Sequence, residues 1–214
     1  MTAPALAPDE FVRGNLTPYG EAGRRMFAML LMTRYVPSRV GSPAFTEVTQ
    51  GRADRALQSK SFFSTCGELC MFLLQQMGYR GPILNRDLPK GDGDRKYASG
   101  KNMNYLVWRS RDEKVWVPFA GELTPKPGDI CFISNGPPAT EHVFVFKQEL
   151  ESGLWESFDG GQQFGGKKWN QCAEVKQRRL VGKKLGGRTL HGWVDISLLE
   201  LTADAVLHEP PQST

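Results

Sequence analysis

A cysteine at a predicted helix start and a histidine at a predicted strand start have the residue types and positions needed for covalent catalysis. Thr65 and Glu68 form a Thr-x-x-Glu capping box, which predicts a helix with Thr65 as its N-cap and Cys66 as its first residue. A helix N-terminus favours a thiolate and can donate a hydrogen bond to an oxyanion. Cys66 is therefore a candidate nucleophile. Its neighbours Thr65 and Gly67 are candidates for supporting the site and its oxyanion. The alternative is that Cys66 is a small buried apolar residue.

A nucleophilic cysteine needs a base, and the chain has three histidines. His142 opens a predicted strand after a Gly-Pro-Pro turn, so its ring could face a cleft. His208 lies in a Pro-rich tail, and His191 could be structural or lie at the rim of the site. Asp159 ends the next predicted strand, and a hairpin pairing could bring its carboxylate to the His142 ring, where it would fix the tautomer. The alternative for Asp159 is an ordinary turn residue before two glycines.

The elements that would position these residues follow from hydrophobic periodicity. Helical spacing predicts a helix from Tyr19 to Tyr35, which the prolines from Pro37 onward end. A second helix runs from Cys66 to Gly78, with Gly78 as its stop and an apolar inner face. Short strands are predicted at 115–119, 130–133, 142–146, 154–158, 175–181 and 189–194, with a closing turn or helix at 196–201. The 142–146 strand is apolar on both faces and so is predicted to be central. One catalytic helix followed by short strands favours an α+β fold.

Composition narrows the class of protein. The chain has 214 residues, 40% of them hydrophobic, which is ordinary for a globular domain. No apolar run reaches the length of a membrane span, and the N-terminus lacks the pattern of a signal peptide. We therefore expect a cytoplasmic protein in the producing cell, with delivery outside by a route other than Sec as an alternative. The net charge of +4 is too small to indicate nucleic-acid binding.

The remaining polar clusters suggest no cofactor. The four cysteines form no CxxC pair, which disfavours a zinc ribbon or a thioredoxin-like redox motif. Because no signal peptide is predicted, we expect free thiols in a reducing compartment, with two disulfides as the alternative. Cys66, Cys70 and a histidine could approach a metal, but a fourth ligand has no local motif, and no metal is predicted. The basic residues of the C-terminal third are interpreted as a solvated face: Lys167, Lys168, Arg178, Arg179, Lys183, Lys184 and Arg188.

Four stretches between residues 61 and 161 resemble the papain-like NlpC/P60 and CHAP superfamily of cysteine peptidases and amidases: STCGELCMFLL, PKPGDICFI, EHVFVF and SFDGG. A looser resemblance, in the Asp-Gly-Gly-Gln run and in Gly-Trp-Val-Asp, is to superfamily members among bacterial toxins and effectors. The resemblance implies a papain-like α+β fold with a catalytic helix packed on a central antiparallel sheet. It assigns Cys66 as nucleophile, His142 as general base and Asp159 as orienting residue. The sequence departs from NlpC/P60 at Thr65, where an Asp is common, and at Asp159, where another His is common.

The function expected from these observations is a cysteine hydrolase that cleaves an amide bond, with a peptidoglycan stem-peptide amide as the preferred substrate by resemblance. The first alternative is a glutamine deamidase acting on a partner protein, and the second is a non-catalytic binding module. Gln162 and Trp193 are expected to contact substrate, and a cognate inhibitor protein is an expected partner. The predicted organisation is a flexible arm at 1–18, a helical extension at 19–44, a catalytic domain at 45–201 and a flexible tail at 202–214.

Overall fold

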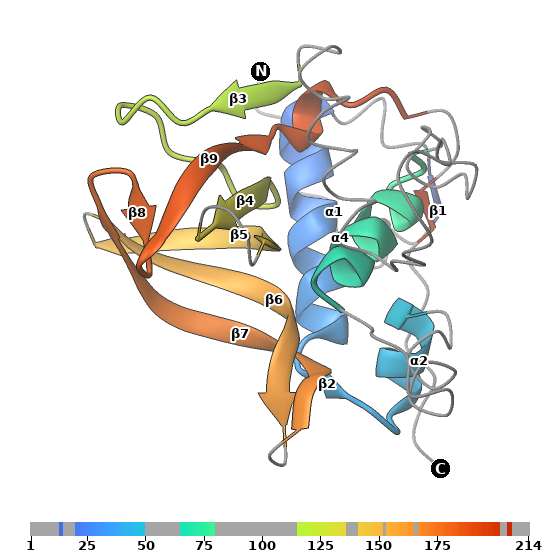
Figure 1. Ribbon diagram of the computed structural model, residues 1–214. Helices are drawn as coiled ribbons and strands as arrows, with labels where there is room; N and C mark the ends of the chain where they lie inside the picture. Colours follow the sequence, from blue (N-terminus) through green and yellow to red (C-terminus); the bar gives the residue numbers. More distant parts are fainter. Residues whose placement is uncertain are drawn as a thin grey trace, which may run out of the picture.

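In a computed structural model, the described part of the chain has three α-helices on one side of a large antiparallel sheet (Figure 1). The structure describes residues 13–14, 20–49, 65–79, 115–135, 141–151, 153–164, 167–201 and 205–206. The helices in these ranges are α1 (Gly20–Tyr35), α2 (Pro43–Thr49), α4 (Thr65–Gln76) and the 3₁₀ helix η4 (Ile196–Leu198).

The sheet closes on itself into a small barrel. Its strands are β2 (Ser38–Arg39), β3 (Trp116–Pro118), β4 (Ile130–Ser134), β5 (Glu141–Glu151), β6 (Leu154–Phe164), β7 (Lys167–Val181), β8 (Lys184–Leu185) and β9 (Arg188–Val194). They pair antiparallel in the order β2-β7-β6-β5-β4-β9-β3. The short strand β8 pairs with both β7 and β9, so the pairing from β4 through β7 and back to β9 is continuous.

The predicted papain-like α+β fold class is therefore wrong. The described part of the chain is dominated by antiparallel sheet and belongs to a sheet-dominated class. The expectation failed because strand lengths were underestimated. The segments predicted at 142–146, 154–158 and 175–181 extend into the long strands β5, β6 and β7, whose polar ends show no apolar pattern. The position of each predicted strand is nevertheless confirmed, and η4 occupies the predicted closing turn.

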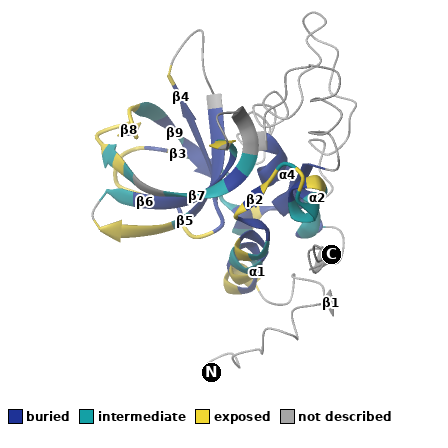
Figure 2. Cartoon of the chain, turned by 90° about the horizontal axis from the view of Figure 1, so that it is seen from below, coloured by how far each residue is buried: buried dark blue, intermediate teal, exposed yellow. Residues whose placement is uncertain are grey.

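Two apolar clusters cover the two faces of the sheet. The interior of the barrel is filled by side chains that include Phe144, Phe146, Trp155 and Trp193. The outer face packs against α1, α2 and α4 through a second cluster. Figure 2 shows buried residues gathered where the helices meet the sheet, and exposed residues at the outer ends of β5 and β8. Strand β5 contributes to both clusters, because alternate side chains point to opposite faces of a strand. This confirms the prediction that it is a central strand.

Both predicted helices are present. Helix α1 ends at Tyr35, before Pro37, as the sequence predicts. Helix α4 buries Leu69 and Leu73 completely, and Met77, directly after the helix, is also fully buried. The chain leaves α4 at Gly78, which has a φ of 85° and donates its N–H to the Gln75 carbonyl. A left-handed glycine of this kind is a common helix stop. Helix α2 lies in a segment whose sequence pattern was ambiguous.

Short segments from the predicted flexible ends meet in the structure. Arg13–Gly14 (β1) pairs antiparallel with Ala205–Val206 (β10). Most of the predicted arm and most of the predicted tail lie outside the described residues. Within the described ranges, every helix is too short or too polar to cross a lipid bilayer.

A buried arginine joins helix α1 to the barrel. Arg25 donates to Asp129 and to Asp195 at 2.7 Å each and to Glu21 at 2.9 Å. Asp129 also accepts the N–H of Lys126. Burial raises the pKa of Asp129 to about 6, against the opposing effect of the Arg25 guanidinium. Arg25 therefore neutralises a carboxylate that the fold has removed from water.

The substitution Arg25→Met is expected to lower the free energy of unfolding by about 3 kcal/mol at pH 7, because it leaves Asp129 as an unpaired buried charge. A raised carboxyl pKa favours the folded state at low pH, and this contribution is lost as the pH rises through the folded pKa. The loss should therefore be smaller at pH 5, where Asp129 can bind a proton. Urea unfolding at both pH values measures the effect. Lys126→Met is the control, because this exposed lysine shares the partner Glu21 and should change stability little. Equal losses at both pH values would contradict the assignment to Asp129.

Candidate active site

Cys66 lies in the first turn of α4, the helix that packs on β5 and β6. Helix α4 begins at Thr65, one residue before the predicted position, and Cys66 is its second residue. The Cys66 side chain belongs to the cluster between the helices and the sheet, and the residue is 5% exposed. The partial positive charge of the helix N-terminus therefore acts on this thiol in a setting with little water.

His142 lies between Cys66 and Asp159. Its Nε2 atom is 2.5 Å from Oδ2 of Asp159, and the ring also hydrogen-bonds with Cys66. Because Asp159 occupies Nε2, the nitrogen that serves the thiol is Nδ1. The hairpin between β5 and β6 produces this contact. Val145 pairs with Phe158, and His142 and Asp159 both lie beyond this pair, toward the same end of the hairpin. The structure thus brings together the three residues that the sequence singled out.

Arg178 on β7 and Ser157 on β6 complete the polar cluster around Asp159. Arg178 donates to both carboxylate oxygens of Asp159, at 2.6 Å and 3.1 Å. Ser157 donates to the same carboxylate at 2.6 Å and accepts from Arg178 at 2.9 Å. Asp159 is completely buried, so these donors replace the water that a carboxylate would otherwise bind.

The opposite charges in this cluster shift one another's pKa values toward the ionised forms. Burial raises the pKa of Asp159, but the Arg178 charge and the His142 hydrogen bond lower it to about 2. Burial lowers the pKa of His142, but hydrogen bonds to Asp159 and Cys66 raise it to about 9. At neutral pH Asp159 is therefore a carboxylate anion, and the ring of His142 is protonated on both nitrogens and positively charged. An imidazolium beside a thiol favours the thiolate.

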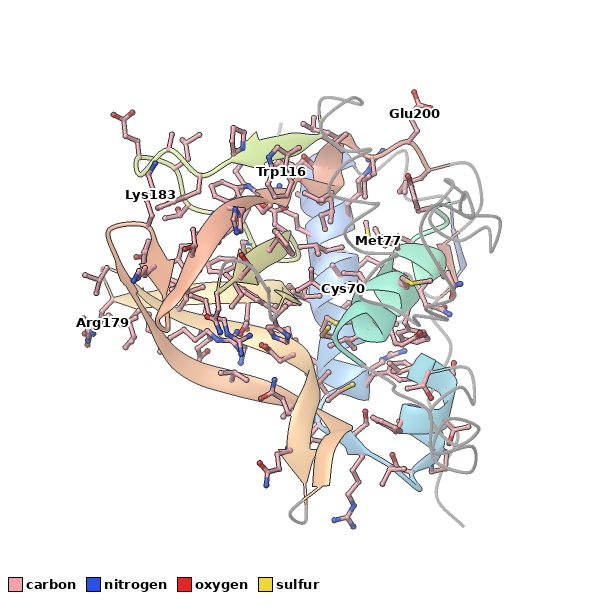
Figure 3. The ribbon with its side chains drawn as sticks, in the orientation of Figure 1. Cys70, Met77, Trp116, Arg179, Lys183 and Glu200 are labelled. Atoms are coloured by element: carbon pink, nitrogen blue, oxygen red, sulfur yellow. The ribbon has the colours of Figure 1, made fainter. Side chains whose placement is uncertain are left out.

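The other three cysteines are completely buried thiols. Burial raises the pKa of Cys70 and Cys131 well above the ordinary range, and raises that of Cys172 to about 12. Figure 3 shows Cys70 between helix α4 and the sheet, whereas Arg179 lies at the outer end of the strands. Only Cys66 among the four has a histidine that is shown to hydrogen-bond with it, within the part of the chain that is described.

The remaining predicted site residues occupy varied positions. Gly67 is buried within α4, and the Thr65 side chain lies outside the described part. Gln162 lies on β6 and donates to the carbonyl of Gly160, 3.5 Å away, and its contact with substrate stays a prediction. Trp193 is 3% exposed and packs near Phe119 in the barrel interior, and its contact with substrate also stays a prediction.

His191 is the other histidine on the described sheet, and its printed contacts are with strand β4. Its Nε2 atom is 2.7 Å from Oγ of Ser134, and its ring centroid is 5.0 Å from that of Phe132. Ser134 and Phe132 lie on β4. His191 is therefore tied to the neighbouring strand β4.

Arg178 is the site residue that sequence analysis missed. It was interpreted as part of a solvated basic face, but its side chain is only 15% exposed. Its neighbour Arg179 is exposed, as predicted. Adjacent residues of a strand point to opposite faces, so one of two consecutive arginines in a strand is directed inward wherever both faces are covered. That alternation was the available signal, but it could not say which of the two arginines turns inward.

Comparison with protein-family models, curated proteins and solved structures gives no match. Within the described ranges, no group of three or more His, Cys, Asp or Glu side chains is placed to hold a metal ion. The geometry and chemistry of the Cys66–His142–Asp159 cluster are therefore the features that point to a function.

Proposed function

We propose that this protein is a cysteine hydrolase that cleaves an amide bond with Cys66 as nucleophile, His142 as general base and acid, and Asp159 as orienting residue. The observation that carries the proposal is the position of His142, which hydrogen-bonds with a helix-start thiol and with a buried carboxylate. A nucleophile, a base within reach of it and a third group that orients the base are the parts of a covalent hydrolase site.

The mechanism follows from this arrangement. In the resting site His142 already holds the proton of Cys66, and the thiolate attacks the amide carbonyl. The N–H of Cys66 lies in the first turn of α4, where the helix dipole favours negative charge, and we assign it to the oxyanion. The protonated His142 then transfers its proton to the leaving nitrogen, and a thioester remains. His142 next deprotonates a water molecule, which hydrolyses the thioester and regenerates the thiol.

Asp159 serves each of these steps without changing its own protonation state. Its negative charge stabilises the imidazolium that forms when Cys66 loses its proton. Its hydrogen bond to Nε2 also holds the ring so that Nδ1 faces the thiol. The pKa of about 2 keeps Asp159 ionised across the pH range in which His142 exchanges protons.

The preferred substrate is a peptidoglycan stem-peptide amide, which is proposed from the resemblance of the four motifs to NlpC/P60 and CHAP hydrolases. The test is mass spectrometry of soluble products after incubation of purified sacculi with wild-type protein and with Cys66→Ala. We expect muropeptide fragments with wild type and none with Cys66→Ala. Cys131→Ala is the matched control, because it removes a buried thiol of the barrel interior and should keep activity.

Two other results would redirect the proposal. If no sacculus is cleaved although Cys66 is alkylated rapidly at pH 6, the substrate would be a protein glutamine, and the mass gain of amide-to-acid conversion should be sought on partner proteins. If Cys66 is alkylated no faster than a model thiol, the hydrolase proposal fails and a binding module becomes the better explanation.

A further inference from the structure

We propose, resting on the hydrolase function above, that Arg178 is a positioning residue that holds Asp159 and balances its charge, so that Cys66 is a thiolate while His142 is an imidazolium. Arg178 does not contact Cys66 in any bond that the structure describes, and it acts through Asp159. Three features of the molecule support this role: the contacts of the guanidinium, the packing of its aliphatic stem and the sum of charges in the buried cluster.

The guanidinium binds Asp159 directly and reaches His142 only through the ring of Phe144. Two of its nitrogens bind the two oxygens of Asp159, a geometry that fixes the plane of the carboxylate. The guanidinium carbon also lies 4.8 Å from the ring centroid of Phe144. The Phe144 ring in turn stacks on His142, with centroids 6.2 Å apart and an interplanar angle of 28°. Arg178 therefore orients the carboxylate and covers the aromatic ring on which the imidazole rests.

The turn between β8 and β9 supports the stem of Arg178. A Cβ added at Gly186 would lie 3.6 Å from Cγ and 3.7 Å from Cδ of Arg178, so the backbone of this turn packs against the stem. Gly186 has a φ of 57°, a conformation that glycine adopts most readily. The same turn joins the two strands that close the barrel. Closure of the barrel thus fixes the arginine that holds the active-site carboxylate.

The sum of charges explains why a buried cation is needed. With Arg178 and His142 positive and Asp159 and Cys66 negative, the cluster is neutral when Cys66 is a thiolate. Without Arg178, the cluster is neutral only when Cys66 keeps its proton. A net charge is costly in a site with little water, so loss of Arg178 should favour the unreactive thiol.

The other thiols around Asp159 do not alter this sum, and Glu68, buried in the first turn of α4, is present alike in the wild type and in the Arg178 variants. These thiols are those of Cys70 on α4, Cys131 on β4 and Cys172 on β7, all neutral because burial raises their pKa. The negative charge of Asp159 adds to the rise in each of these pKa values, whereas Arg178 lowers that of Cys131. The charges of Asp159 and Arg178 therefore act in opposite directions on a nearby thiol, as the proposal requires for Cys66.

The test measures the rate at which iodoacetamide alkylates Cys66 between pH 5 and pH 10, followed by mass spectrometry of the peptide that contains Cys66. We expect Arg178→Gln to slow alkylation about tenfold at pH 6 and to move the pH of half-maximal rate upward by about one unit. Arg178→Lys retains the charge and should retain the wild-type midpoint. Arg179→Gln removes an exposed charge from the next residue and should behave as wild type. Circular dichroism establishes that each variant is folded.

The outcomes separate this proposal from the proposed function. An ordinary thiol profile in the wild type would overturn the hydrolase site itself. A reactive wild type with the same midpoint in Arg178→Gln would overturn only the role of Arg178. If Arg178→Gln does not fold, Arg178→Met replaces it, because the apolar side chain keeps the stem against Gly186. If neither neutral variant folds, Arg178 is needed for folding alone and the positioning role is rejected.

Discussion

The substitution His142→Ala is expected to lower turnover by about 10⁴-fold relative to the wild-type protein, because the thiol loses its base and the leaving group loses its proton donor. The same variant should lose the rapid alkylation of Cys66 at pH 6. His142 is protonated up to about pH 9, so in the wild type it stabilises the thiolate over the whole neutral range. Without the imidazolium, Cys66 should react no faster than a model thiol.

Alkylation is measured in parallel with fragment release from sacculi, so that the result does not depend on the substrate. His191→Ala is the matched control, because it removes the other histidine of the described sheet, one that hydrogen-bonds with Ser134. It should change neither measurement by more than a small factor. Rapid alkylation of Cys66 in His142→Ala would show that another group activates the thiol.

The substitution Asp159→Asn is expected to reduce turnover by about 10³- to 10⁴-fold, an effect close to that of the equivalent change in serine protease triads. An asparagine carries no charge to stabilise the imidazolium. If its amide donates to Nε2, the proton of a neutral ring is left on Nδ1, and that nitrogen can no longer accept the proton of Cys66. The measurement is turnover by the folded variant, compared with the wild type across pH 5 to 9.

Asp159→Asn should also lower stability, by about 3 kcal/mol at pH 7, because Arg178 is left as a buried cation without its carboxylate. The pKa of Asp159 is lowered, so its contribution to stability is present above the ordinary aspartate pKa and is lost as the pH falls through about 2. The wild type and the variant should therefore approach equal stability only in strong acid.

Glu156→Gln is the matched control for Asp159→Asn, because Glu156 is a buried carboxylate of the same strand that lies 3.5 Å from Lys147. It should keep full turnover. If Asp159→Asn were as active as the wild type, Asp159 would have no orienting role and another group would hold the imidazole.

The candidate site could be predicted from sequence where the signals were local. The capping box locates the start of α4 to within one residue and so identifies Cys66 as a helix-start thiol. The alternation of apolar residues locates β5 and β6, and a hairpin between them brings Asp159 to His142. Each of these features depends on residues close together in the chain, which is why a sequence pattern is sufficient to find it.

The closure of the barrel depends on residues that no local pattern connects. Strand β8 has two residues, yet its pairing with β7 and β9 converts an open sheet into a ring. The sequence pattern shows short strands but does not show how far their polar ends continue to pair. A sheet-dominated fold was therefore mistaken for a papain-like α+β fold.

The direction of the Arg178 side chain depends on the register in which β6 and β7 pair. Near Asp159, β6 and β7 pair in one register, Asp159 with Ala173 and Ser157 with Val175. A bulge then shifts the register by one residue, so that Arg178 pairs with Trp155, whose side chain fills the barrel. A one-residue shift reverses which side chains point inward, so the bulge turns Arg178 toward Asp159 and leaves Arg179 outside. The sequence by itself identified the candidate nucleophile, base and orienting carboxylate, while the register of two long strands decided which arginine contacts that carboxylate.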